Sequence, residues 1–103
     1  MRVMLKVTIP VEKGSQALAD GSLPKMMQAV LGDLKPEAAY FLTLEGKRTS
    51  LLFVDLADPS QIPALAEPFF MRLNAEVDIY PVMNADDLAK GLAGVMDTVR
   101  KYQ

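Results

Sequence analysis

The residues of this chain that could do chemistry are carboxylates, lysines and tyrosines, because the sequence contains neither histidine nor cysteine. Without imidazole, a Ser-His-Asp arrangement, a His-ligated haem and His-based zinc or iron sites are excluded. Without thiols, disulfides, iron–sulfur clusters and thiol nucleophiles are excluded as well. Any acid–base step would fall to a carboxylate, a lysine or a tyrosine whose pKa is shifted by its surroundings. We therefore expect no metal and no cofactor.

One set of candidate site residues follows from the alternation of side chains along four predicted strands. Successive residues of a strand point to opposite faces of a sheet. The candidate ligand-binding residues on the less apolar face are Met4, Lys6, Phe41, Phe53, Asp55, Asp78 and Tyr80. Either they pack and form salt bridges at a subunit interface, or some of them contact a ligand or act as acid and base. Asp55 and Asp78 are the pair of carboxylates that could be catalytic.

Four strands would position these residues. The predicted strands are residues 2–9, 38–45, 48–56 and 76–83. Pro10 ends the first strand because proline has no N–H for the ladder. The second and third strands are joined by a tight turn at 45–48 that contains glycine, which is a hairpin signal.

Three helices complete the predicted elements. They are residues 15–34, 58–73 and 84–102. In the first, Gly21 interrupts the helix and Ser22 caps its main part. Asp58 and Asn84 are expected to cap the other two, each with a polar residue three positions on that could complete a capping box. Each helix has an apolar stripe at helical spacing.

The element order is β-α-β-β-α-β-α, which predicts the split βαβ arrangement with parallel first and third strands in an antiparallel four-stranded sheet, covered by helices on one face. The fold class is α+β, a ferredoxin-like βαββαβ domain over residues 1–103 with an extra C-terminal helix. The strand residues expected to face the helices are Val3, Leu5, Val7, Ile9, Leu42, Leu44, Leu52, Val54, Leu56, Val77 and Ile79.

Charge and hydropathy restrict the partners. The net charge is −2 and no cluster of Lys and Arg occurs, whereas a nucleic-acid binder shows a basic face, so we expect no nucleic-acid partner. No run approaches the roughly 18 apolar residues of a membrane span, and the N-terminus does not look like a signal peptide. We expect no membrane association and a cytoplasmic location.

The second sheet face itself predicts a partner. It is too apolar to lie bare in water and too polar for an ordinary core. Packing it on the same face of a second copy would give a homodimer, a closed two-sheet barrel, with a cleft between the subunits for a small, partly apolar ligand.

Three segments carry a family resemblance: residues 35–41, 66–70 and 81–84. Together they resemble a group of small bacterial proteins of uncharacterised function, similar to the dimeric α+β barrel superfamily that includes muconolactone isomerase-like proteins. The resemblance implies a homodimer with a cleft, and it transfers no catalytic residue. The monooxygenase and haem-handling branches of the superfamily generally use His or Trp, and this chain has neither.

Three functional hypotheses follow. The first is a homodimeric binding or accessory domain that holds a small ligand in its cleft. The second is a cofactor-independent isomerase or lactone-handling enzyme in which Lys6, Asp55, Asp78 or Tyr80 transfers a proton, which requires burial to raise a carboxylate pKa. The third is a purely structural oligomerisation module.

Overall fold

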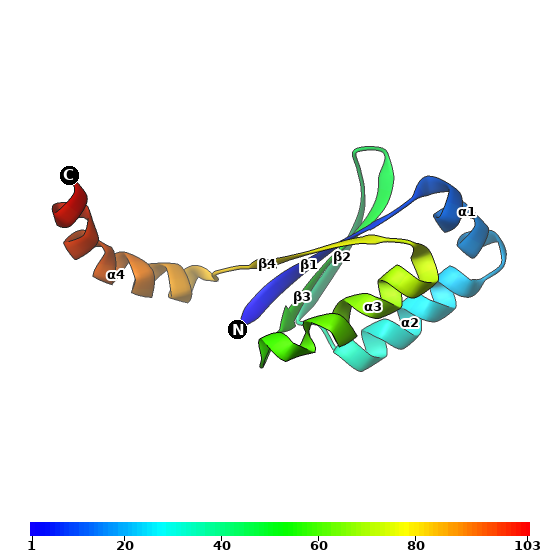
Figure 1. The fold of residues 1–103 in the computed structure, drawn as a ribbon, viewed down its shortest axis with the longest axis horizontal. Coiled ribbons are helices and arrows are strands. Elements are labelled where there is room, and N and C mark those ends of the chain that lie inside the picture. The colour runs from blue at the N-terminus through cyan, green and yellow to red at the C-terminus, as the bar shows by residue number, and fades with distance from the viewer.

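The computed structural model describes residues 1–103 and contains one sheet, three helices packed on one of its faces, and a fourth helix that stands apart (Figure 1). The elements are β1 (Arg2–Ile9), α1 (Val11–Ala19), α2 (Ser22–Leu34), β2 (Ala38–Leu44), β3 (Lys47–Asp55), the 3-10 turn η1 (Pro59–Gln61), α3 (Ile62–Leu73), β4 (Glu76–Pro81) and α4 (Ala85–Tyr102).

The sheet has the strand order β2-β3-β1-β4, and every neighbouring pair is antiparallel. This is the predicted α+β, ferredoxin-like type of arrangement with an additional C-terminal helix. The expectation that the first and third strands run parallel is wrong, because β1 and β3 are antiparallel neighbours. The split βαβ unit instead separates β1 from β2 by one strand, with β3 between them.

The core lies between the sheet and the helices α1, α2 and α3. Alternate residues of β1 are almost fully buried, from Val3 to Ile9. From α3, Phe69 and Leu73 reach the same core with at most 1% of their surface exposed. The predicted apolar stripe of this helix is confirmed.

The first helical segment begins earlier than predicted, at Val11 instead of residue 15. Pro10 is the N-cap of α1, because proline suits the start of a helix although it ends the strand before it. The interruption at Gly21 is confirmed: this residue has a φ of 82° and precedes α2, and glycine adopts that conformation without steric cost. Ser22 is the first residue of α2 and not its cap.

The hairpin between β2 and β3 closes with a two-residue loop. Glu45 and Gly46 have φ values of 53° and 79°, which is the backbone pattern of a type I′ turn. Leu44 therefore lies opposite Lys47. At the turn, β2 ends at Leu44 and β3 begins at Lys47, each one residue earlier in the chain than the sequence indicated.

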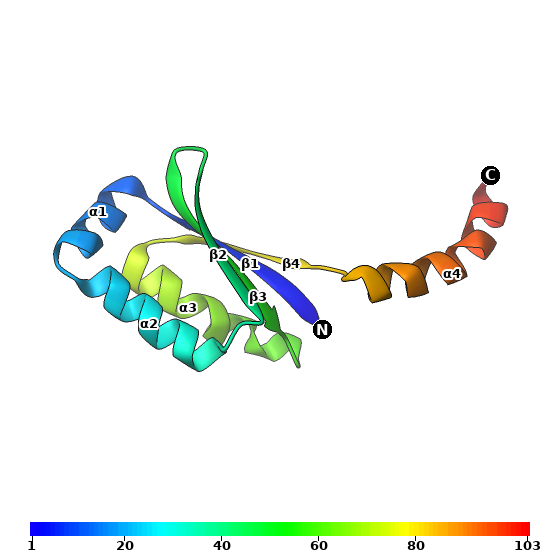
Figure 2. The same ribbon diagram turned by 180° about the vertical axis from the view of Figure 1, so that it is seen from behind.

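Caps at the start of the later helical segments are confirmed. Asp58 and Gln61 form a reciprocal capping box ahead of α3, and Asn84 and Asp87 form another at the start of α4. The fourth strand ends at Pro81, two residues before its predicted end. Figure 2 shows α4 from behind, continuing outward from β4 and away from the other helices. No helix of the structure combines the length and the apolar character needed to cross a membrane.

Candidate functional site

The side of the sheet that faces away from α1, α2 and α3 is called the open face here. Strand register decides which residues belong to it, since residues opposite one another on neighbouring strands share a face. Its members are Arg2, Met4, Lys6, Thr8, Ala38, Tyr40, Leu42, Leu44, Lys47, Thr49, Leu51, Phe53, Asp55, Glu76, Asp78 and Tyr80. Six of the seven predicted site residues lie on this face.

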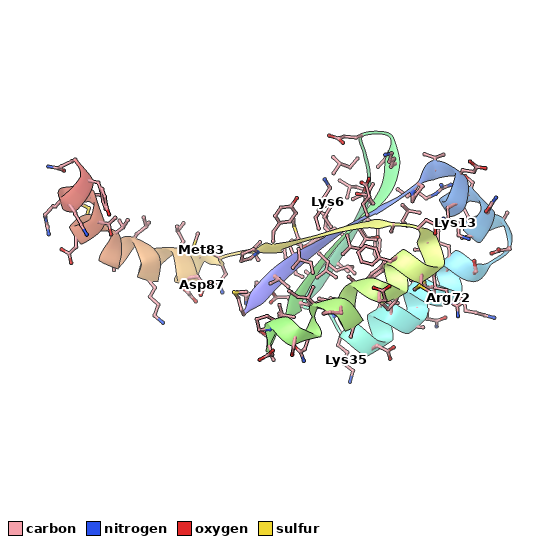
Figure 3. All side chains as sticks on the ribbon, viewed as in Figure 1. Lys6, Lys13, Lys35, Arg72, Met83 and Asp87 are labelled. Carbon is pink, nitrogen blue, oxygen red and sulfur yellow. The ribbon has the colours of Figure 1, made fainter.

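Two rows of side chains run across the open face. In one row Phe53, Met4 and Tyr80 lie opposite one another on β3, β1 and β4. In the next row Lys6 lies between Leu51 and Asp78. Figure 3 shows Lys6 pointing away from the helix layer. The two rows place one ammonium group among apolar and aromatic side chains, beside one carboxylate.

Aromatic side chains widen this apolar area toward β2. Tyr40 meets Phe53 edge to face, with 6.3 Å between the ring centroids. Such a contact adds to the stabilisation that burial alone provides. Tyr40 and Tyr80 are nevertheless 61% and 45% exposed. The open face therefore presents aromatic surface that nothing in the single chain covers.

Phe41 is the predicted site residue that the structure places elsewhere. It lies opposite Ser50, and Ser50 lies opposite the buried Val7, so Phe41 is on the helix side of the sheet. There it borders a hollow of about 370 Å³ together with Leu23 and Met27 of α2. Leu42 and Leu44 are on the open face instead of the helix side. The two-residue loop explains both differences from the prediction. It pairs odd-numbered residues of β2 with even-numbered residues of β3, and the even-numbered residues of β3 face the helices.

The structure does not bring the two candidate carboxylates together. Asp55 is opposite Arg2 and Asp78 is opposite Lys6, four residues further along β1. At the usual rise of a strand, this separates them by roughly 13 Å along the sheet. The Asp55 carboxylate also accepts a hydrogen bond from the N-terminal ammonium at 2.9 Å. Both side chains are exposed in the single chain.

Arg2 is the centre of a charged cluster that sequence reasoning missed. Its Nε donates to Glu37, and its Nη1 lies 3.4 Å from Oδ2 of Asp87. The hydrogen bond to Glu37 raises the pKa of Arg2 above its ordinary value, so the guanidinium stays charged. No sequence signal pairs residue 2 with residues 37 or 87. The cluster joins β1 to the start of β2 and to the first turn of α4.

Two further carboxyls have lowered pKa values for structural reasons. Hydrogen bonds from Ser22 lower the pKa of Asp20, and hydrogen bonds from Ser60 lower the pKa of Asp58. Each carboxylate accepts a backbone N–H at the start of a helical segment. These shifts reflect helix capping and identify no reacting group.

A second hollow of about 610 Å³ lies between α2 and α3, on the other side of the molecule from the open face. Lys13, Lys25 and Arg72 surround an apolar floor that includes Val30. No buried side-chain polar atom lacks a hydrogen-bond partner. No group of acidic residues is arranged to hold a metal ion. The open face is thus the place where charge, aromatic surface and exposure coincide.

Comparison with models of known protein families gives no match, and comparison with curated proteins gives no match either. The resemblance noted from the sequence is therefore supported at the level of the fold alone, an α+β domain with a four-stranded antiparallel sheet.

Proposed function

We propose that this chain is a homodimeric domain that binds a small, partly apolar ligand on its open face, in a space that a second copy closes. The observation that carries the proposal is the position of Lys6, which is partly buried in the middle of an exposed apolar and aromatic sheet face. The sequence resemblance to dimeric α+β barrels likewise implies a homodimer with a cleft.

The chemistry of the open face defines the class of ligand. Small-molecule sites are mainly apolar, with a few polar groups that orient the ligand. Phe53, Met4 and Tyr80 offer an apolar wall, and the Lys6 ammonium offers three donors beside it. A small molecule with an aromatic or aliphatic body and one carboxylate would satisfy both. Asp78 would keep the Lys6 side chain in place when no ligand is bound.

A cofactor-independent isomerase or lactone-handling enzyme has less support. Such an enzyme needs an acid and a base on either side of the reacting atom, within hydrogen-bond reach. Asp55 is far along the sheet from Lys6 and is hydrogen bonded to the N-terminal ammonium. Only Lys6, Asp78 and Tyr80 lie close enough together to share a substrate.

The test is native mass spectrometry of the full chain incubated with a mixture of aromatic and aliphatic carboxylic acids. We expect the dimer to bind one of these carboxylic acids. The substitution Lys6→Met should weaken that binding by about tenfold or more, since a hydrogen bond to a charged group contributes about 1.5–3 kcal/mol. Lys25→Met, on α2 away from the open face, is the matched control and should bind normally.

Two results would contradict the proposal. One is equal binding by the Lys6→Met protein and the unchanged chain. The other is a dimer whose open face is filled entirely by partner side chains and holds no ligand, which would favour a purely structural oligomerisation module.

A further inference from the structure

The feature that the proposed function leaves unexplained is α4. This helix has 18 residues and none of them is buried. It extends beyond the sheet at the end of β4, and the molecule as a whole measures 58 × 28 × 21 Å (Figures 1 and 2). Its contact with Arg2 through Asp87 is confined to the first turn, whereas helices in proteins owe most of their stability to packing of an apolar face.

The side chains of α4 are sorted by character around its axis. Large apolar residues recur at alternating spacings of four and three: Leu88, Leu92, Val95, Val99 and Tyr102. The charged residues all lie on the other side: Asp86, Asp87, Lys90, Asp97, Arg100 and Lys101. Ala85, Ala89 and Met96 widen the apolar side to an arc of roughly 140° at 100° per residue. Such an arc is typical of a helix that packs on a protein core.

The accessible surface area of the chain indicates how much surface a partner would cover. The accessible surface is 7166 Å², whereas a compact monomer of this mass exposes about 5,700 Å². The radius of gyration is 17.1 Å, whereas a compact chain of this length has a value of about 13 Å. The excess of roughly 1,400 Å² exceeds the roughly 800 Å² that each partner buries in a standard stable interface.

Contacts at the base of α4 direct it away from its own body. The Val82 N–H donates to the Arg2 carbonyl and extends the β1–β4 ladder past Pro81. Asn84 and Asp87 exchange capping hydrogen bonds, and Arg2 also contacts Asp87. Figure 3 shows Met83 and Asp87 at this junction, beyond the end of the sheet. These bonds fix the first turn of α4 in the direction of β4.

We propose that α4 is an exchanged arm: in the homodimer, the apolar side of each α4 lies over the open face of the other copy. Each open face then gains a helix that its own chain does not supply. This inference rests on the homodimer of the proposed function and names the element that covers the site around Lys6.

The shapes of the two surfaces agree with this occupant. A helix of 18 residues is about 27 Å long, and the central strands β1 and β3, with eight and nine residues, are about 26–30 Å long, so α4 can cover most of the length of the open face. Pairing of the two α4 helices with each other fits less well. The positions that flank its central stripe are Ala89, Gly91, Met96 and Thr98, and they lack the charges that pair helices in two-stranded coiled coils.

The first experiment compares two full-length variants that place the same residue on opposite sides of α4. In light scattering, we expect the unchanged chain and the Lys90→Glu variant to be dimers with twice the 11.3 kDa mass of one chain. We expect the Leu92→Glu variant to be a monomer with the mass of one chain. Far-UV circular dichroism of the Leu92→Glu protein would show that the body is still folded. A dimeric Leu92→Glu protein would overturn the inference.

The second experiment uses the absence of cysteine in the chain, which makes introduced thiols unambiguous. A Leu92→Cys chain and a Met4→Cys chain are co-expressed, and their thiols are bridged with a short bis-maleimide. We expect a covalent heterodimer, and none when Lys90→Cys replaces Leu92→Cys. Bridging of Leu92→Cys to itself alone, bridging within one chain carrying both substitutions, or no bridging at all would each overturn the inference.

The outcomes separate this inference from the proposed function. A dimer that binds a carboxylate but shows no link between Leu92→Cys and Met4→Cys retains the proposed function and rejects the exchanged arm. A dimer that shows the link but binds no ligand does the opposite. A monomeric unchanged chain rejects both.

Discussion

Glu45 has a backbone conformation that its side chain does not favour. Its φ is 53°, and only glycine, asparagine and aspartate adopt positive φ readily. The following Gly46 adopts the positive φ of a type I′ loop without steric cost, whereas Glu45 adopts it with strain. This loop nevertheless sets the pairing of β2 and β3, and through it the face on which each β2 residue lies.

We predict that Glu45→Asn stabilises the protein by about 0.5–1 kcal/mol, because asparagine accepts the left-handed conformation that this loop requires. The measurement is the midpoint of urea unfolding. Glu45→Ala is the control, since alanine has no such preference. Equal midpoints for the Asn and Ala variants would show that the loop conformation is not what limits stability here.

Phe41 shows at the same scale where sequence reasoning failed. Tyr40, Phe41 and Leu42 are all apolar, so alternation alone assigns none of them to a face with certainty. The strand pairing places Tyr40 and Leu42 on the open face and Phe41 on the helix side, where it is still 58% exposed. Met4, Lys6 and Phe53 were placed correctly because their strands alternate against clearly buried neighbours.

At the scale of elements, local capping signals were reliable. Asp58 with Gln61 and Asn84 with Asp87 were recognised from residue type and spacing, and both form reciprocal capping boxes. Such bonds involve residues three apart in the chain and therefore depend little on the rest of the fold. The first turn of α1, residues 11–14, was missed because a proline that ends a strand and a proline that precedes a helix look the same in sequence.

The cap of the η1–α3 segment predicts a specific pH dependence. Hydrogen bonds from Ser60 lower the pKa of Asp58 in the folded protein below its ordinary value of 3.8. Because the folded pKa is the lower one, this stabilisation is fully present above pH 3.8 and is lost as the pH falls through the folded value.

We therefore expect the unchanged protein to lose more stability than Asp58→Asn when the pH is lowered from neutral to about 3, since asparagine also caps helices but does not titrate there. Urea unfolding of both proteins at the two pH values measures the difference. Parallel losses in the two proteins would mean that the charge of Asp58 contributes nothing to the cap.

At the scale of the whole molecule, the extended shape has a thermodynamic consequence. A chain that leaves α4 and the open face uncovered buries less apolar surface than its composition allows. If a second copy covers them, folding and association are coupled, and the unfolding temperature depends on protein concentration.

We predict that a hundredfold increase in protein concentration raises the unfolding temperature by on the order of 5 °C, as expected for a dimer of two chains of this length. Differential scanning calorimetry or fluorimetry over that range measures it. An unfolding temperature that does not change with concentration would indicate that each chain folds alone.

The sequence by itself determined the elements, their order and the fold class, because apolar periodicity, prolines and caps are local properties that a folded chain must satisfy. It also determined that histidine and cysteine chemistry is excluded. Only the tertiary structure decided which residues meet: the face of Phe41, the distance between Asp55 and Asp78, the cluster at Arg2 and the outward direction of α4. These depend on strand register and on contacts between residues distant in sequence, and a register change of one residue turns every side chain to the other face.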